Sequence, residues 1–158
     1  MDEVTAQAQA WLKKVKCEDT GDYDPLITYY FINKSLNMSS GKIGVQTARA
    51  GQVMLLREME HSDSLLPLSL NELFVDNFMH GNKSICLRAN DSQMRRLLSG
   101  DLRSKLSELA EQAGVPLRLY PVYDIGATEV ASNSLTVIGL TPVRKSIISS
   151  FTRKFNLY

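Results

Sequence analysis

Hydrophobic and polar residues follow one another in blocks that predict alternating strands and helices. The run LITYYFIN at residues 26–33 is dominated by apolar and aromatic side chains, which is typical of a buried strand. Shorter apolar runs with strand composition follow at 83–89, 115–123 and 135–140. Between the runs, apolar residues recur at helical spacing, which predicts helices over 42–60, 69–81, 92–100, 101–114 and 142–155.

This order of elements predicts an α/β fold in which helices cover both faces of one sheet. We expect a three-layer α/β/α arrangement with a small mixed, mostly parallel four-stranded sheet. The loop at 124–134 is too short for a helical crossover, so the two strands that flank it are expected to run antiparallel if they pair. In the helix at 42–60, the following residues lie near one face: Val45, Ala48, Gln52, Leu55, Leu56 and Met59.

The length of 158 residues indicates one main domain. Residues 25–158 are expected to form it. Residues 1–24 are expected to form an amphipathic helix and a polar linker, because apolar side chains of this segment, among them Trp11 and Leu12, recur at helical spacing.

Composition narrows the possible functions. With 44% hydrophobic and 22% charged residues the chain is globular, and its net charge of +1 means that nucleic acid would bind through a local patch. No apolar stretch approaches the roughly 20 residues of a membrane span, and the N-terminus lacks the features of a signal peptide. Two distant cysteines and two isolated histidines fit no metal site. We therefore expect a cytoplasmic protein without a cofactor.

The polar loop and helix start around Lys42 form a candidate anion site. Ser39 or Ser40 can cap the helix, and a helix N-terminus attracts negative groups. Lys42 is unusual there, because a cation in the first turn faces the positive end of the helix dipole. It is either a surface lysine or a residue that points at a negative group. A nucleotide-binding P-loop is excluded, since Leu36 and Ile43 stand where its first glycine and its hydroxyl residue belong.

A second candidate loop begins at Asp124, directly after a predicted strand. Ligands of α/β proteins bind outside the carboxyl ends of strands, which favours this loop and the one before Lys42. Gly126 follows, and Thr128 and Thr136 supply hydroxyl groups. Alternatively, Asp124 caps its own turn and Thr136 merely suits a strand. No Ser-His-Asp or Cys-His arrangement can be argued, so hydrolysis here would use an oriented water.

Three short stretches carry a recognisable pattern. Residues 37–50 read NMSSGKIGVQTARA, residues 124–129 read DIGATE, and residues 133–140 read NSLTVIGL. In order, and in internal spacing as far as Val137, they resemble the motifs of the type-II peptidyl-tRNA hydrolase family. The resemblance covers about residues 26–157.

The resemblance implies hydrolysis of the ester bond that joins the peptide to the 3′ end of tRNA in peptidyl-tRNA. It marks five residues as catalytic or close to the reaction, all of them present: Lys42, Gln46, Asp124, Thr128 and Thr136. We expect Asp124 to orient or deprotonate water that Thr128 and Thr136 fix. Lys42 would hold Asp124 ionised and stabilise developing negative charge or a terminal phosphate.

The chain departs from the family pattern at four places. Arg49 replaces the usual histidine, Ala127 a basic residue and Asn133 a glycine, and the strand after Thr136 is two residues shorter before Gly139. The first two changes motivate an alternative, a non-catalytic tRNA- or protein-binding module with the same fold. A further alternative is a regulatory domain whose N-terminal helix recruits a partner.

Binding of peptidyl-tRNA would require a basic rim around the site. The predicted helices carry two groups of cations, Arg95, Arg96, Arg103 and Lys105 in one, and Arg144, Lys145, Arg153 and Lys154 in the other. The predicted tRNA contacts are Arg49, Arg95, Arg96, Arg144 and Lys145. Each is alternatively part of a solvated helix face. The family resemblance also implies a possible homodimer.

Overall fold

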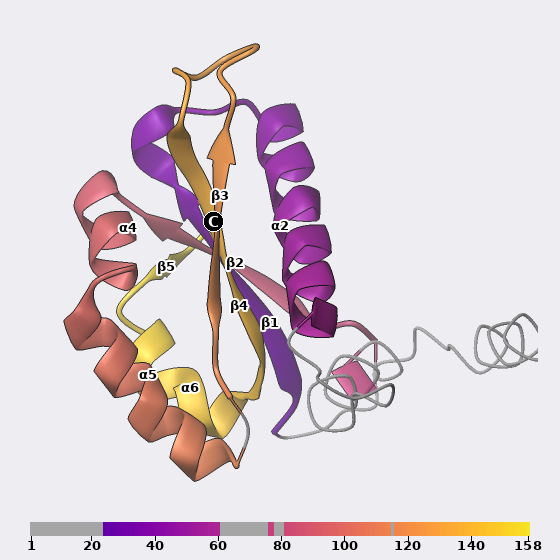
Figure 1. The fold of residues 1–158 in the computed structure, drawn as a ribbon, viewed down its shortest axis with the longest axis vertical. Helices are drawn as coiled ribbons and strands as arrows, with labels where there is room; N and C mark the ends of the chain where they lie inside the picture. The colour runs from indigo at the N-terminus through magenta and orange to yellow at the C-terminus, as the bar shows by residue number, and fades with distance from the viewer. Residues whose placement is uncertain (1–23, 61–75, 78–80, 115) are drawn as a thin grey trace, which may run out of the picture.

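A computed structural model describes residues 24–60, 76–77, 81–114 and 116–158 (Figure 1). One five-stranded sheet, in the order β3-β4-β1-β2-β5, forms its centre. The strands are β1 (Leu26–Asn33), β2 (Ser84–Ala89), β3 (Leu119–Asp124), β4 (Ser134–Arg144) and β5 (Asn156–Leu157). The helices are the 3-10 turn η1 (Lys34–Leu36) and the α-helices α2 (Ser40–Glu60), α4 (Asp91–Leu97), α5 (Gly100–Ala113) and α6 (Lys145–Thr152).

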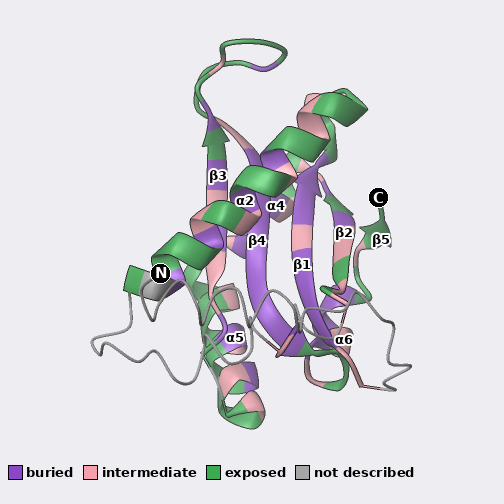
Figure 2. Ribbon diagram, turned by 90° about the vertical axis from the view of Figure 1, so that its right-hand side faces the viewer, coloured by how far each residue is buried: buried purple, intermediate pink, exposed green. Residues whose placement is uncertain are grey.

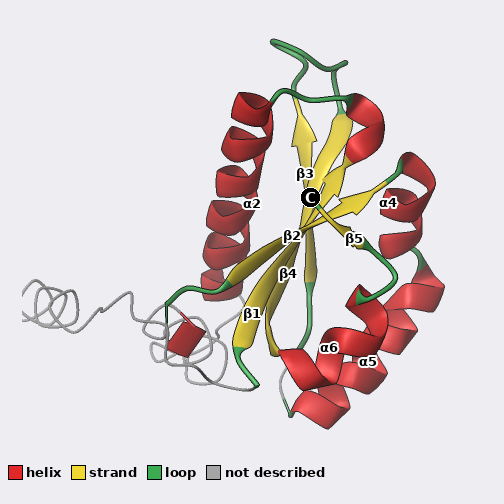
Figure 3. Ribbon diagram, turned by 180° about the vertical axis from the view of Figure 1, so that it is seen from behind, coloured by secondary structure: helices red, strands yellow, loops and turns green. Residues whose placement is uncertain are grey.

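Helices cover both faces of the sheet, as predicted. Figures 1 and 3 show α2 alone on one face and α4, α5 and α6 together on the other. The prediction of a mostly parallel, four-stranded sheet is wrong. Only β1 and β2 pair in parallel, whereas β1–β4, β3–β4 and β2–β5 are antiparallel, and the short strand β5 adds a fifth member.

The direction of β4 explains this error. A parallel pair needs a long crossover connection, and the connection from β1 to β2, which contains α2, provides one. β4 instead follows β3 through a short loop and lies between β3 and β1, antiparallel to both. The predicted antiparallel relation of the last two long strands is therefore confirmed, but it extends to β1 as well.

The last helix begins later than predicted. Pro142 was expected to start it, but Pro142 lies inside β4, and α6 begins at Lys145. The pairing register of β1 and β4 shifts between Ile27 and Tyr29, so that Thr141 and Pro142 both face Thr28. Such a bulge leaves a residue outside the hydrogen-bond ladder, which suits proline because it lacks an N–H group.

Other predicted elements agree more closely with the structure. β1 covers the predicted range 26–33, and α5 ends at Gly114, which adopts a left-handed conformation (φ 69°). Asn90 caps α4 through a reciprocal pair of hydrogen bonds with Gln93. The amphipathic helix predicted within residues 1–24 and the helix predicted at 69–81 lie outside the described residues, apart from residues 24, 76, 77 and 81.

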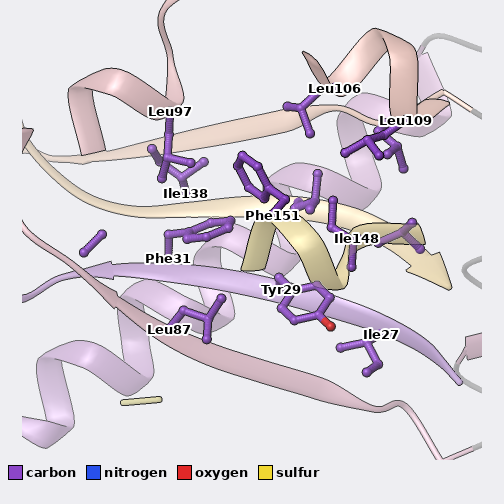
Figure 4. Packing of buried hydrophobic residues seen from close by; sticks show 14 of the residues in the cluster. Ile27, Tyr29, Phe31, Leu87, Leu97, Leu106, Leu109, Ile138, Ile148 and Phe151 are labelled. Atoms are coloured by element: carbon purple, nitrogen blue, oxygen red, sulfur yellow. The ribbon is translucent and has the colours of Figure 1, made fainter. Parts of the chain in front are cut away.

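Two hydrophobic clusters hold the layers together. The larger one packs α4, α5 and α6 on the sheet around Phe31, whose ring meets that of Phe151 edge to face at 6.2 Å between centroids (Figure 4). The smaller one, around Ile32, Val122 and Val137, lies on the side of the sheet that α2 covers. This smaller cluster anchors the first half of α2 close to the ends of β1 and β3.

The surface of α2 is more apolar than a solvated helix face usually is. Val45 and Leu56 are 65% and 61% exposed, and Figure 2 shows the outer side of the helix as largely exposed. The face of α2 that is turned toward the sheet carries buried polar side chains, among them Gln46 and Glu58. In the ranges that the structure describes, no helix is long and apolar enough to cross a bilayer.

Candidate active site

The start of α2 and the end of β3 meet at one edge of the sheet. Ser39 caps α2, since its hydroxyl oxygen accepts the Lys42 backbone N–H at 3.2 Å. Lys42 Nζ lies 2.5 Å from Asp124 Oδ2 and donates to Thr128 Oγ1 at 2.8 Å. The structure therefore brings together Lys42, Asp124 and Thr128, although Lys42 and Asp124 are 82 residues apart in the chain.

Asp124 is buried but is surrounded by donors. Only 4% of it is exposed. Oδ2 accepts from Lys42 Nζ and from Gln46 Nε2 at 2.8 Å, and Oδ1 accepts from the Gly126 backbone N–H at 2.6 Å. The hydrogen bond from Lys42 is the largest cause that holds the pKa of Asp124 below its usual 3.8, followed by that from Gly126. Asp124 is therefore an ionised carboxylate at neutral pH.

Gln46 and Thr136 form a buried support behind this carboxylate. Thr136 is fully buried, and its hydroxyl lies within hydrogen-bond distance of Gln46 Oε1 (2.8 Å) and of the Val122 carbonyl (3.1 Å). By donating to Gln46 Oε1, Thr136 orients the amide so that its nitrogen faces Asp124. Both side chains therefore act on the position of Asp124 rather than at the protein surface.

The anion site expected at the start of α2 is filled by the protein itself. The carboxylate of Glu129 accepts from the Ser39 backbone N–H at 2.8 Å and from the Ser39 hydroxyl at 2.5 Å. These bonds lower the pKa of Glu129. Sequence reasoning did not select Glu129, although the acidic position in the stretch DIGATE was a usable signal. Glu129 thus fastens the loop between β3 and β4 to α2.

Two unusual backbone positions shape that loop. Gly126 has φ 80°, and a side chain there would lie 2.4 Å from the Ser132 backbone nitrogen, so only glycine fits. Asn133 also adopts the left-handed region (φ 62°), and its N–H donates to the Asp124 carbonyl at 2.7 Å. The loop therefore returns to the strand directly beside Asp124.

The comparisons with known proteins identify the chain's family. The family model described as Peptidyl-tRNA hydrolase PTH2 matches residues 26–158. The chain belongs to this family. The peptidyl-tRNA hydrolase of Thermoplasma acidophilum is 25% identical over 126 residues, which are 80% of this chain and 92% of that protein. Peptidyl-tRNA hydrolase 2 of Saccharomyces cerevisiae is 27% identical over 128 residues, 80% of this chain and 55% of the yeast protein.

Membership in the peptidyl-tRNA hydrolase family confirms the predicted family, reaction and enzyme class, because these proteins are ester hydrolases that act on peptidyl-tRNA. The residue at the left-handed position 133 illustrates how this member departs from the family pattern. Asparagine is among the non-glycine residues that most readily adopt this conformation, so Asn133 fits a position at which the motif resemblance expects glycine.

The predicted tRNA contacts are spread over the domain. Arg49 is exposed on α2, and its positive charge contributes to the low pKa of Asp124. Arg95 and Arg96 are exposed on α4, on the opposite face of the sheet (Figure 1). Arg144 and Lys145 lie at the far end of β4, roughly 25 Å along the strand from Thr136. Of these cations, only Arg49 is thus close to the Lys42–Asp124 pair.

Metal chemistry receives no support from the donor groups. Among the described residues, no group of three or more His, Cys, Asp or Glu side chains could hold a metal ion. His61 and His80, which sequence reasoning judged too isolated for a metal site, lie outside the described residues.

Proposed function

We propose that the chain cleaves the ester bond of peptidyl-tRNA with a water that Asp124 orients, while Lys42 stabilises the negative charge that develops on the ester oxygen. The observation that carries this proposal is the contact of Lys42 Nζ with both Asp124 and Thr128. An aminoacyl ester is already activated, so a positioned water and a stabilised oxyanion suffice for hydrolysis.

Asp124 retains one acceptor site for a water. A carboxylate offers about four acceptor sites, and Lys42, Gln46 and Gly126 occupy three of them. The remaining site, on Oδ1, would accept a hydrogen bond from the attacking water. With its pKa held below the usual value, Asp124 is a weak base, which favours orientation of the water over full deprotonation.

Lys42 has one donor to spare. Its ammonium group has three N–H bonds, two of which are directed at Asp124 and Thr128. The third would stabilise the oxyanion, and because the side chain is only 11% exposed, this charge acts where water screens it little. The attraction between Lys42 and the Asp124 carboxylate thus offsets the unfavourable interaction of this lysine with the positive end of the α2 dipole.

Thr128 shares the ammonium group with Asp124, so we propose that its hydroxyl contacts the water or the ester group. Gln46 and Thr136 are positioning residues, because they are buried and reach the reaction only through Asp124. Their removal would change the aim of the carboxylate rather than the charge of the site.

We propose Arg49 as the principal contact to the tRNA backbone near the ester. Arg95, Arg96, Arg144 and Lys145 would contribute only if the tRNA extended around the sheet to the other face or end. If Arg49 neutralises one phosphate, Arg49→Gln should lower the slope of log binding constant against log salt concentration by about 1. Arg144→Gln should leave the slope unchanged, and equal effects of the two changes would contradict this assignment.

The decisive experiment is release of N-acetylated amino acid from charged tRNA by the purified chain. We expect release that requires neither added metal nor added cofactor. If no release occurs while uncharged tRNA still binds, the chain is a non-catalytic tRNA-binding module and the proposed reaction is wrong.

We further propose a cytoplasmic homodimer. The support for the dimer is the family resemblance, and Val45, Leu55 and Leu56 offer an exposed apolar surface that a second copy would bury. Light scattering on purified wild-type protein and on Leu56→Glu tests this, since the variant should then be monomeric. The support for the location is that cytoplasmic translation produces peptidyl-tRNA, so the enzyme would meet its substrate there, and cell fractionation tests this.

A further inference from the structure

A pocket lies on the face of the sheet opposite the Lys42–Asp124 pair. It opens between α4, α5 and the end of α6 with the residues that follow it, and its volume is about 260 Å³. Sequence reasoning divided the basic residues of these helices into two separate groups. The fold brings Arg96 and Lys105 from one group and Lys154 from the other around the same opening.

The rim of this pocket is positively charged. Arg96, Lys105 and Lys154 line it together with a single carboxylate, Asp101. Within the part of the chain that the structure describes, none of the three cations forms an ion pair. Three uncompensated cations against one carboxylate favour a ligand with negative charge.

The interior of the pocket is apolar. Leu97, Leu102, Phe151 and Phe155 line it, and Leu97 and Phe151 belong to the core shown in Figure 4. Phe155 packs edge-on against Phe31, with ring centroids 4.9 Å apart. The volume is below the roughly 300–1,000 Å³ typical of pockets for drug-sized ligands, so it suits one inserted side chain rather than a cofactor.

We propose that this pocket binds an acidic peptide segment of a partner protein. One apolar side chain of the peptide enters the pocket, and carboxylates on either side of it pair with Arg96, Lys105 and Lys154. Asp101 accepts a backbone N–H of the bound peptide. The site lies on the other side of the sheet from the ester-cleaving groups, so the partner and the reaction centre do not compete.

The geometry favours a peptide over RNA. Single-stranded RNA requires a groove of cations that follows its backbone and open aromatic rings on which bases stack. Here the cations surround a small hollow instead of following a groove, and Phe151 is almost completely buried, so its ring is not open for stacking. A peptide with an apolar side chain between carboxylates matches both the positive charge of the rim and the apolar interior.

The test uses fluorescence polarisation with the full chain and three labelled peptides. The first has the sequence DEDLFEDE, the second replaces its Leu-Phe pair with Gly-Ser, and the third replaces its acidic residues with Ser. We expect measurable binding of the first peptide and binding at least about tenfold weaker for each of the others, because each control loses one of the two contributions. Equal binding of all three, or no binding of the first, overturns the proposal.

Adjacent residues supply matched controls. Arg96→Glu and Lys154→Glu reverse charges on the rim, whereas Arg95→Glu and Arg153→Glu reverse charges one position away and outside the pocket lining. The first two should weaken binding of the acidic peptide by about tenfold or more, and the controls by no more than about twofold. If all four reduce binding equally, the peptide recognises a general basic surface and the pocket has no role.

Two more measurements separate this site from the hydrolase site. Asp124→Asn should bind the acidic peptide as well as the wild-type chain does, whatever its hydrolytic activity. Uncharged tRNA should not displace the peptide at low salt. If tRNA does displace the peptide, and if Arg96→Glu and Arg95→Glu change this displacement equally, the surface binds nucleic acid instead. This result would overturn the proposal.

Discussion

Asp124 combines burial with a low pKa, two properties that usually oppose each other. Burial alone raises the pKa of a carboxyl group, but here the donors around it outweigh this effect. The residue therefore brings a fixed negative charge to a position where substrate water would arrive. At the residue scale, two properties can be tested: the charge of Asp124, and the effect of Lys42 on the pKa of Asp124.

Replacement of Asp124 by asparagine tests the charge. Asp124→Asn keeps the size of the side chain but removes its charge and two acceptor sites for the surrounding donors. We expect turnover to fall by about 10²-fold or more. Binding of uncharged tRNA should stay the same or tighten, because a negative charge is removed near the phosphates. Single-turnover release of N-acetylated amino acid measures the first effect, and full activity in the variant would rule out the proposed role.

Replacement of Lys42 by methionine tests the origin of the low pKa. Lys42→Met removes its largest cause, so the pKa of Asp124 should rise. If the reaction uses the ionised carboxylate, as proposed above, the acid limb of the kcat/KM profile should move to higher pH. The ion pair stabilises the fold above pH 3.8 and loses this contribution as the pH falls through the lowered pKa, so the variant should also lose stability at neutral pH.

The pKa shift can be measured without catalysis, by carbon NMR titration of the Asp124 carboxyl group. Lys34→Met is a suitable control, because Lys34 is an exposed lysine of η1. A similar shift in both variants would mean that overall charge, not the Lys42 contact, sets the pKa of Asp124.

At the scale of elements, the site depends on how the loop between β3 and β4 is attached to α2. The loop carries Thr128, and α2 carries Lys42, which donates to it. Next to this contact, the hydrogen bonds between Glu129 and Ser39 join the loop to the start of α2. The same carboxylate lies at the positive end of the α2 dipole, which favours its charged form. We therefore expect Glu129 to act as a positioning residue.

Removal of this link should reduce catalysis more than binding. In Glu129→Ala both bonds to Ser39 are lost, and we expect kcat to fall by about tenfold or more with a smaller change in KM, as small displacements of reacting groups have large effects on rate. Glu129→Gln, which keeps the size and one acceptor oxygen, should recover part of the activity. Steady-state kinetics compare these variants with Glu108→Ala, a control at an exposed residue of α5. An equal loss of kcat in Glu129→Ala and Glu108→Ala would mean that the link to Ser39 does not matter.

At the scale of the whole molecule, α2 is tied to β3 at both of its ends. Lys42 contacts Asp124 at one end. Near the other, Glu58 is fully buried and accepts from Arg118 Nη1 at 2.8 Å and from the Tyr120 hydroxyl. Burial, and then the hydrogen bond to Glu58, raise the pKa of Tyr120, so it remains a donor. This second tie holds the helix in the register that aligns Lys42 with Asp124.

Loss of this second tie should destabilise the domain. Breaking a fully buried ion pair costs about 3–5 kcal/mol. Because 35% of the Arg118 side chain is exposed, we expect Arg118→Met to lower the free energy of unfolding by roughly 2 kcal/mol. Arg57→Met breaks the exposed pair with Glu60 and should cost about 0.5 kcal/mol or less. Urea denaturation compares the two variants, and equal losses would contradict the role of burial.

Local patterns in the sequence were sufficient to predict individual elements and to select the candidate site residues. The apolar run of β1, the glycine that ends α5 and the cap of α2 each depend on contacts within a few residues, so sequence spacing records them. The motif residues Lys42, Gln46, Asp124, Thr128 and Thr136 were selected from the sequence, and the structure places them in one network.

The sequence by itself thus determined where most described strands and helices lie, which family the motifs resemble and which side chains are candidates for the site. Only the tertiary structure decided the direction of β4 beside β1, the location of Pro142 in a bulge, the attachment of Glu129 to Ser39 and the gathering of Arg96, Lys105 and Lys154 around one pocket. The physical reason is that these features join residues far apart in the chain. Periodicity reports which side of an element is apolar, but not which distant element lies against it.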